Sequence, residues 1–265
     1  MEARRVTASH GWDWINQGGR LLFQKLGTCL LFFAVTLVIW KLIYLVPHVG
    51  FLIATLLTPL AIGVFGIACR DLQHGRPFMP NELLFTLKPF ATRLLRIGFI
   101  NLAGLIVMAG VIVMITRDPI LAMATLGDWQ LYDRVMEKEI TSAMYTGVLL
   151  ASAASFILFF ASWFSPLLVV FNGMKPEDAM KNSFKASFYN VGPFLLFGLV
   201  LAGSWVGYTI VMYLLPSAVL VPLGQRELLL PAIKFLSAFY WPFVAPIIYA
   251  AHYASYADVF APQSS

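Results

Sequence analysis

The sequence predicts an all-α integral membrane protein with six transmembrane helices. Hydrophobic residues make up 60% of the 265 residues and charged residues only 12%, whereas soluble domains average about 45–50% and about 25%. Apolar stretches near the roughly 20 residues that cross a bilayer core recur along the chain. A soluble globule could not bury that much apolar surface. The 22 Phe and two Cys also exclude a disordered chain and a disulfide-stapled secreted fold.

We expect residues 1–265 to form a single membrane domain. The predicted spans cover approximately 25–45, 50–69, 97–115, 145–171, 193–215 and 235–256. The first has the shortest uncharged run, between Lys25 and Lys41, but lysine side chains can snorkel toward the headgroups. This run begins more than 20 residues into the chain and lacks a small-residue cleavage site, so we interpret it as a retained span.

Basic residues indicate the orientation of the spans. With six spans both termini face the same side, and that side carries 12 Lys and Arg against six on the other. The positive-inside rule places the richer side in the cytoplasm. A basic cytoplasmic face meets anionic lipid headgroups, which accounts for the net charge of +5 without nucleic acid as a partner.

An internal repeat is the third feature of the sequence. Its unit is an amphipathic helix, an outward span and an inward span that contains proline, and it occurs at about 9–71, 81–174 and 177–260. The amphipathic segments are 11–27, 81–98 and 177–192, and the aligned prolines are Pro59, Pro166 and Pro246. Because each unit has two spans, the repeats are predicted to be parallel, about an axis along the membrane normal.

Each of these prolines is expected to kink its helix, because proline removes one backbone hydrogen bond and clashes with the preceding turn. In lipid the released carbonyl needs another partner, which the hydroxyls of Thr58 and Ser165 can supply. Three kinked helices can frame a cavity that opens to the cytoplasm, or they can simply improve packing. The sequence favours packing and leaves the cavity as the alternative.

Few residues suggest chemistry. The four His have no metal-ligand spacing, and no nucleotide-binding or nucleophile-elbow motif is present. His252 lies among tyrosines near the inner end of the last span, where it either handles protons or has a structural role. Asn172, like Asn101 and Asn190, can form hydrogen bonds between helices. The sequence nominates no catalytic residue, cofactor ligand or metal ligand; the candidate cavity or kink positions are Pro59, Pro166, Pro246, Ser165, Asn172 and His252.

The motif GSWVG (203–207) has the G-x-x-x-G spacing that lets two membrane helices approach closely. It suits dimerisation and internal packing equally well. Acidic side chains lie at the predicted cytoplasmic boundary, namely Asp258 and the pair Glu177–Asp178. The pair begins a predicted helix, where negative charge stabilises the helix dipole, so we interpret it as structural.

Three segments carry a resemblance to a known family. They are ARRVTASHGWDWINQGGRLL (3–22), WFSPLLVVFNGMKPEDAMKNSF (163–184) and YASYADVF (253–260). The chain resembles the BPSS-type family of uncharacterised bacterial inner-membrane proteins over nearly its whole length. The central segment is more distantly similar to the membrane domain of some glycerophosphodiester phosphodiesterases, but no soluble catalytic domain accompanies it. The resemblance implies a bacterial inner (plasma) membrane location and no specific reaction.

The function we expect is that of a non-enzymatic membrane protein that organises or assists other membrane components, with a membrane protein as partner. The alternative is a transporter of small molecules or lipids that uses a cavity among the kinked helices. A membrane-embedded enzyme is the least favoured hypothesis, because it requires convergent His, Asp or Glu side chains that the spacing does not indicate.

Overall fold

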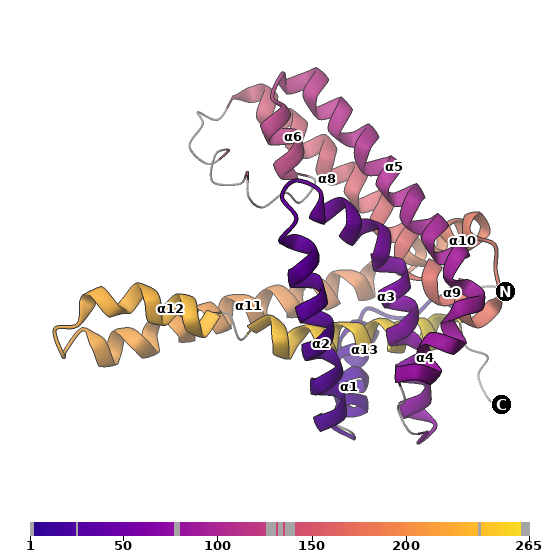
Figure 1. Cartoon of the computed structure of the whole chain (residues 1–265), viewed down its shortest axis with the longest axis horizontal. Coiled ribbons are helices and arrows are strands. Elements are labelled where there is room, and N and C mark those ends of the chain that lie inside the picture. The colour runs from indigo at the N-terminus through magenta and orange to yellow at the C-terminus, as the bar shows by residue number, and fades with distance from the viewer. Residues whose placement is uncertain are drawn as a thin grey trace. The chain divides into compact units, whose positions relative to one another are not determined.

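The computed structural model describes residues 3–24, 26–76, 80–125, 131, 135, 141–237 and 240–260. Within these residues the regular structure is entirely helical (Figure 1). The chain divides into two compact units. The first comprises Met1–Leu37, Leu72–His74 and Asn190–Ser265, and the second comprises Val38–Asp71 and Gly75–Tyr189. These units do not follow the limits of the predicted repeats, and the single-domain organisation stays a prediction.

The first unit joins the beginning of the chain to its end. Its helices are α1 (His10–Phe23), the first part of α2 (Leu26–Tyr44), the last two residues of α3 (Gly50–Gln73), α11 (Val191–Leu220), η3 (Arg226–Leu228), α12 (Leu229–Ser237) and α13 (Tyr240–Phe260). Lys25, which begins the first predicted span, lies outside the described residues. Helix α1 buries one face, which carries Gly11, Trp14, Gly18 and Leu22 at helical spacing.

Two glycines let α1 lie directly on other helices of the first unit. A Cβ atom at Gly11 would meet the carbonyl oxygen of Pro193 in α11 at 2.2 Å. A Cβ atom at Gly18 would meet the backbone nitrogen of Ala251 in α13 at 2.6 Å. Glycine is therefore required at both close approaches. The predicted amphipathic segment 11–27 thus contains a helix whose apolar face is covered by protein.

Helices α11 and α12 run side by side as a hairpin in the first unit (Figure 1). Aromatic residues join α11 to the start of α13: the ring of Tyr240 lies 4.7 Å from Trp205 and 5.0 Å from Tyr208, centroid to centroid. The Tyr240 and Ser204 hydroxyl oxygens are 2.7 Å apart. Tyr240 is buried.

The second unit contains the remainder of α2 and α3 and the central helices. These are α4 (Pro80–Leu87), η1 (Lys88–Phe90), α5 (Ala91–Thr116), α6 (Pro119–Thr125), α8 (Ser142–Trp163), α9 (Ser165–Asn172) and α10 (Pro176–Tyr189). Helices α5 and α8 pack through Met108, Ile112 and Ala151. The Ser162 hydroxyl donates a 2.7 Å hydrogen bond to Asn101 Oδ1, an interhelical bond of the predicted kind.

In the described part of the chain, four helical stretches are long and apolar enough to cross a membrane. They are Gly50–Gln73, Glu82–Thr116, Ser142–Asn172 and Val191–Leu220, which contain the second to fifth predicted spans. The first predicted span corresponds to a shorter apolar helix, Phe33–Tyr44, and the sixth lies largely in the 21-residue α13. The chain is thus a membrane protein with several candidate spans, and a total of six stays a prediction.

The three prolines behave differently. Helices α3 and α13 continue through Pro59 and Pro246, whereas α8 ends at Trp163 and α9 begins at Ser165, next to Pro166. The Ser165 hydroxyl donates to the carbonyl of Ser162 at 3.4 Å, which is the carbonyl that Pro166 leaves without its helical partner.

The Thr58 hydroxyl does not play the corresponding role beside Pro59. It donates at 2.8 Å to the carbonyl of Ala54, whereas Pro59 releases the carbonyl of Thr55. A threonine hydroxyl in a helix readily bonds the carbonyl four residues back, and this local geometry prevails at Thr58.

Candidate functional site

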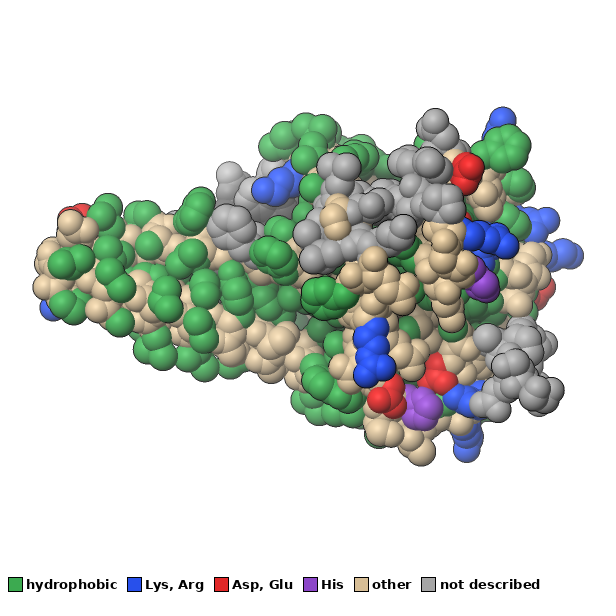
Figure 2. Space-filling view, turned by 90° about the horizontal axis from the view of Figure 1, so that it is seen from below, with side chains coloured by type: hydrophobic (Ala, Val, Ile, Leu, Met, Phe, Trp, Pro, Cys, Tyr) green, Lys and Arg blue, Asp and Glu red, His purple; other side chains and the backbone are tan. Residues whose placement is uncertain are grey.

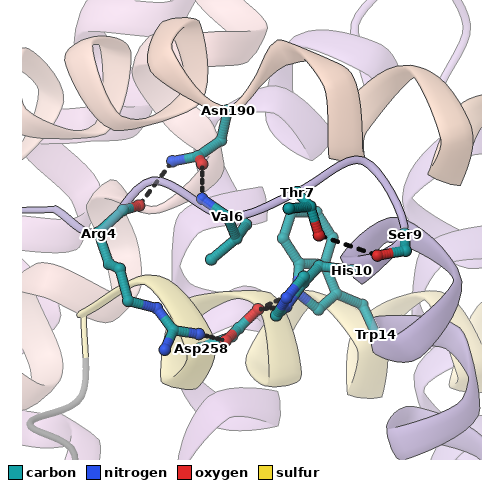
Figure 3. A network of polar contacts seen from close by, with 8 residues as sticks. All are labelled: Arg4, Val6, Thr7, Ser9, His10, Trp14, Asn190 and Asp258. Atoms are coloured by element: carbon teal, nitrogen blue, oxygen red, sulfur yellow. Dashed lines mark hydrogen bonds and ion pairs between the residues drawn. The ribbon is translucent and has the colours of Figure 1, made fainter.

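The carboxylate of Asp258 in α13 gathers three donors from the beginning of the chain (Figure 3). Arg4 forms an ion pair with Oδ1. His10 Nδ1 and Trp14 Nε1 lie 2.7 Å and 2.9 Å from Oδ2. The Asp258 side chain is only 12% exposed, so these contacts replace the water that the carboxylate loses on burial. We call these four residues the Asp258 cluster.

Asn190 holds the same N-terminal segment from the other side. Its Oδ1 accepts a 2.8 Å hydrogen bond from the backbone N–H of Val6, and its Nδ2 donates to the carbonyl of Arg4 at 3.0 Å (Figure 3). The backbone N–H of Arg4 in turn donates to the carbonyl of Val259 at 3.0 Å. Asn190 is fully buried. Backbone and side-chain bonds together therefore fasten residues 4–6 between the start of α11 and the end of α13.

Chemically, the Asp258 cluster is an anion surrounded by donors. A His–Asp pair is also the arrangement in which a carboxylate orients a general base. Here, however, Oδ2 is shared with the indole of the fully buried Trp14. The cluster thus orders α1 against α13. Among the described residues, no group of three or more His, Cys, Asp or Glu side chains is arranged to hold a metal ion.

Two cavities flank α1 within the first unit. The first, of about 200 Å³, is lined by Gln17 and Arg20 of α1, by Gln24 that follows α1, by Gln73 of α3 and by Tyr253 of α13. Leu21, Ala254 and Ala257 complete it. We call it the Arg20 cavity. The second, of about 320 Å³, is almost wholly apolar. It is lined by Gly19, Leu22, Phe23, Cys29, Phe243, Pro246 and Ile247, and we call it the Pro246 cavity.

The six positions nominated from the sequence fall in both units. Pro59, Ser165, Pro166 and Asn172 belong to the second unit, whereas Pro246 and His252 belong to the first. Ser165 is buried, Asn172 is exposed at the end of α9, and Pro246 lines the cavity named after it. His252 is buried in α13, and its carbonyl accepts a 2.7 Å hydrogen bond from Ser255. A common cavity for these positions stays the alternative hypothesis.

Sequence reasoning missed the Asp258 cluster as a unit. The sequence alone marks Asp258 as a boundary residue and does not connect Arg4, His10 or Trp14 with it. A signal was nevertheless present: all four residues lie in the two terminal segments, 3–22 and 253–260, that carry the family resemblance.

Comparison with known proteins supports the conclusion that the chain is a membrane protein. The chain is 25% identical to a probable inner membrane protein of Burkholderia thailandensis over 274 aligned residues, which cover 99% of this chain and 95% of that protein. No protein-family model matches the chain, and no solved structure matches it. The near full-length similarity supports the resemblance to bacterial inner-membrane proteins. It gives no support to the more distant resemblance to glycerophosphodiester phosphodiesterases.

Proposed function

We propose that the chain is a non-enzymatic multi-pass protein of the bacterial inner membrane that organises or assists another membrane component. The observation that carries this proposal is the surface of α11. Of the four candidate spans, α11 has the smallest buried share, 11%, against 44% for α3. Hydrophobic side chains are spread over the α11–α12 hairpin (Figure 2).

The G-x-x-x-G motif lies open on that helix. A Cβ atom at Gly203 or Gly207 would meet nothing within 4 Å, so the motif is not used for close packing within the described part of the chain. Small residues in membrane helices allow backbones to approach and make van der Waals contact. This favours a second transmembrane helix, from a partner protein or another copy of the chain, as the occupant of this face.

Paired substitutions on α11 test the proposal. The double variant Gly203→Ile, Gly207→Ile fills the proposed contact, and Gly198→Ile is the matched control, because Gly198 is also open but lies on another face of α11. After purification in mild detergent, we expect a stoichiometric protein partner or dimer with the wild type and the control, and its loss with the double variant. Equal association of all three proteins would contradict the proposal.

The six-span topology is part of this proposal, with both termini in the cytoplasm. The backbone bond from Arg4 to Val259 supports an even number of spans, because it brings the two ends of the described chain together. The excess of Lys and Arg supports the orientation. Tags at the N- and C-termini should both be shielded from membrane-impermeant reagents applied outside intact cells. Labelling of one tag alone would refute the topology.

The threefold repeat also remains part of the proposal. It is supported by separate helices that precede the odd-numbered predicted spans: α1 before α2, α4 before α5, and α10 before α11.

Anionic headgroups at the basic face are the expected lipid partners.

Lipid or small-molecule handling is a second candidate function. The observation that favours it is the Pro246 cavity, where an aligned proline borders about 320 Å³ of apolar space. Filling this space with Gly19→Leu should lower transport or lipid exchange in reconstituted vesicles if the cavity carries cargo. Unchanged exchange would reject this role.

A further inference from the structure

The Arg20 cavity has the composition of a binding site for an oxyanion. Of the residues that line it, Arg20 is charged, four others are polar, and none is acidic. Its volume of about 200 Å³ is below the roughly 300–1,000 Å³ of sites for drug-sized ligands. The space therefore suits one small charged group.

The guanidinium of Arg20 is free to bind such a group. Other arginines have protein partners: Arg70 pairs with Asp71 at 3.1 Å, and Arg96 with Glu177 at 2.7 Å. Arg20 forms no hydrogen bond or ion pair with any residue in the described part of the chain. A guanidinium presents five N–H donors in a planar fork that matches two oxygens of a phosphate.

The neighbouring amides add donors around the same space. Gln17 and Gln24 lie three residues before and four residues after Arg20, and because Gln24 caps α1 with helical backbone angles, all three lie on the same side of the helix. Across the cavity the hydroxyl of Tyr253 donates to Gln73 Oε1 at 2.9 Å. Because this bond occupies the amide oxygen, Gln73 retains its NH₂ group as a hydrogen-bond donor.

We propose that the Arg20 cavity binds a phosphate group, with Arg20 as the anchoring cation and Gln73 as a fixed donor. The same two helices, α1 and α13, also line the almost wholly apolar Pro246 cavity. A polar and an apolar cavity along one pair of helices favour a phospholipid as the source of the phosphate over a soluble phosphate. The site is independent of both proposed functions, since a bound phospholipid can be cargo or a structural component.

Three variants of the full chain test the site. Arg20→Gln removes the cation, Gln73→Glu places a carboxylate against the phosphate, and Arg226→Gln is the control because Arg226 lies in η3, outside the cavity. The thermal unfolding temperature of each variant in detergent tests whether the variant remains folded. We expect no change with Arg20→Gln, since Arg20 is exposed and has no hydrogen-bond or ion-pair partner among the described residues.

Binding is measured by native mass spectrometry on delipidated protein with phosphatidylglycerol, diacylglycerol and inorganic phosphate as separate probes. We expect saturable binding of one phosphatidylglycerol to the wild type and to Arg226→Gln. Arg20→Gln should weaken it about ten- to a hundredfold, as expected for loss of hydrogen bonds to a charged group, and Gln73→Glu should weaken it as well. Diacylglycerol, which lacks the phosphate, should not compete.

The outcomes separate the two sources of phosphate. Arg20-dependent binding of inorganic phosphate without binding of phosphatidylglycerol supports the phosphate site and assigns it to a soluble ligand. Equal binding of phosphatidylglycerol and diacylglycerol would overturn the proposal, as would equal affinities in Arg20→Gln and Arg226→Gln. Loss of the partner helix from α11 would leave this measurement unchanged, so failure of the proposed function and failure of the site are distinguishable.

Discussion

The indole Nε1 of Trp14 donates a 2.9 Å hydrogen bond to the carboxylate of Asp258, 244 residues further along the chain. Trp14, on the covered face of α1, is fully buried. Its ring meets the ring of Phe194 edge-on, with the centroids 5.5 Å apart. Apolar contact and a specific polar bond thus act at one side chain. This pairing sets the position of the first helix on the last.

Replacement of Asp258 by alanine should destabilise the first unit. The substitution leaves the buried Trp14 N–H without its acceptor and removes the ion-pair partner of Arg4. Loss of a buried acceptor costs about 1–3 kcal/mol, and we expect a decrease of that size in the free energy of unfolding in detergent. Asp178→Ala, at an exposed position in α10, is the control. An equal, small effect of both substitutions would show that the cluster contributes little.

Gly18→Ala should separate α1 from α13. Its Cβ atom would lie 2.6 Å from the backbone nitrogen of Ala251, which cannot rotate away. Overpacking of this kind costs about 1–3 kcal/mol, measurable as a lower unfolding temperature. The adjacent Gly19→Ala meets nothing within 4 Å and should be neutral or stabilising by up to about 1 kcal/mol. If the two variants unfolded alike, the close approach of the helices would be disproved.

Asn190→Ala should release the N-terminal segment while leaving the helices in place. The backbone N–H of Val6 loses its acceptor, and the carbonyl of Arg4 loses its donor. Hydrogen exchange at the Val6 amide should therefore accelerate by about five- to thirtyfold if the lost bond contributes some 1–2 kcal/mol. Asn182→Ala, in α10 of the second unit, should leave that rate unchanged. Unaltered exchange in Asn190→Ala would mean that other contacts hold the segment.

Ser183→Ala should weaken the junction of α8 and α9. The buried Ser183 hydroxyl donates to the carbonyl of Phe160 at 2.7 Å and accepts from the backbone N–H of Phe164 at 2.9 Å. Alanine removes the acceptor of the Phe164 N–H and leaves the Phe160 carbonyl with the longer, 3.3 Å bond from the Ser187 hydroxyl, at a cost of about 1–3 kcal/mol in unfolding free energy. Ser152→Ala, at an exposed position of α8, should change stability by less than about 0.5 kcal/mol. Unchanged stability of Ser183→Ala would show that the bonds of Ser183 do not hold this junction.

The helical architecture and the second to fifth predicted spans could be read from the sequence because they depend on local runs of apolar residues. The interruption beside Pro166 was equally local, since proline lacks the N–H that continues a helix. The sequence of α13 does not distinguish a membrane span from a helix covered by protein. It combines tyrosines with His252 and Asp258, and residues 250–256 are buried from every side, a pattern that suits both a membrane span and a helix covered by protein.

The candidate site could not be predicted because it depends on pairing between distant segments. Arg20, Gln73 and Tyr253 are ordinary polar residues in the sequence, and only packing of α1 on α13 makes them line one cavity. Gly11 and Gly18 allow that packing, but glycine alone does not reveal which helix approaches it. The family resemblance marked both terminal segments without indicating that they meet.

The bond between Arg4 and Val259 has a consequence for biogenesis. At translation rates of roughly 5–20 residues per second, α1 leaves the ribosome roughly ten to fifty seconds before its binding surface on α13 exists. During that interval the apolar side chain of Trp14 must be shielded from water by the lipid surface or by a chaperone. A truncated polypeptide that lacks its final helix would therefore expose its own beginning to quality-control proteases.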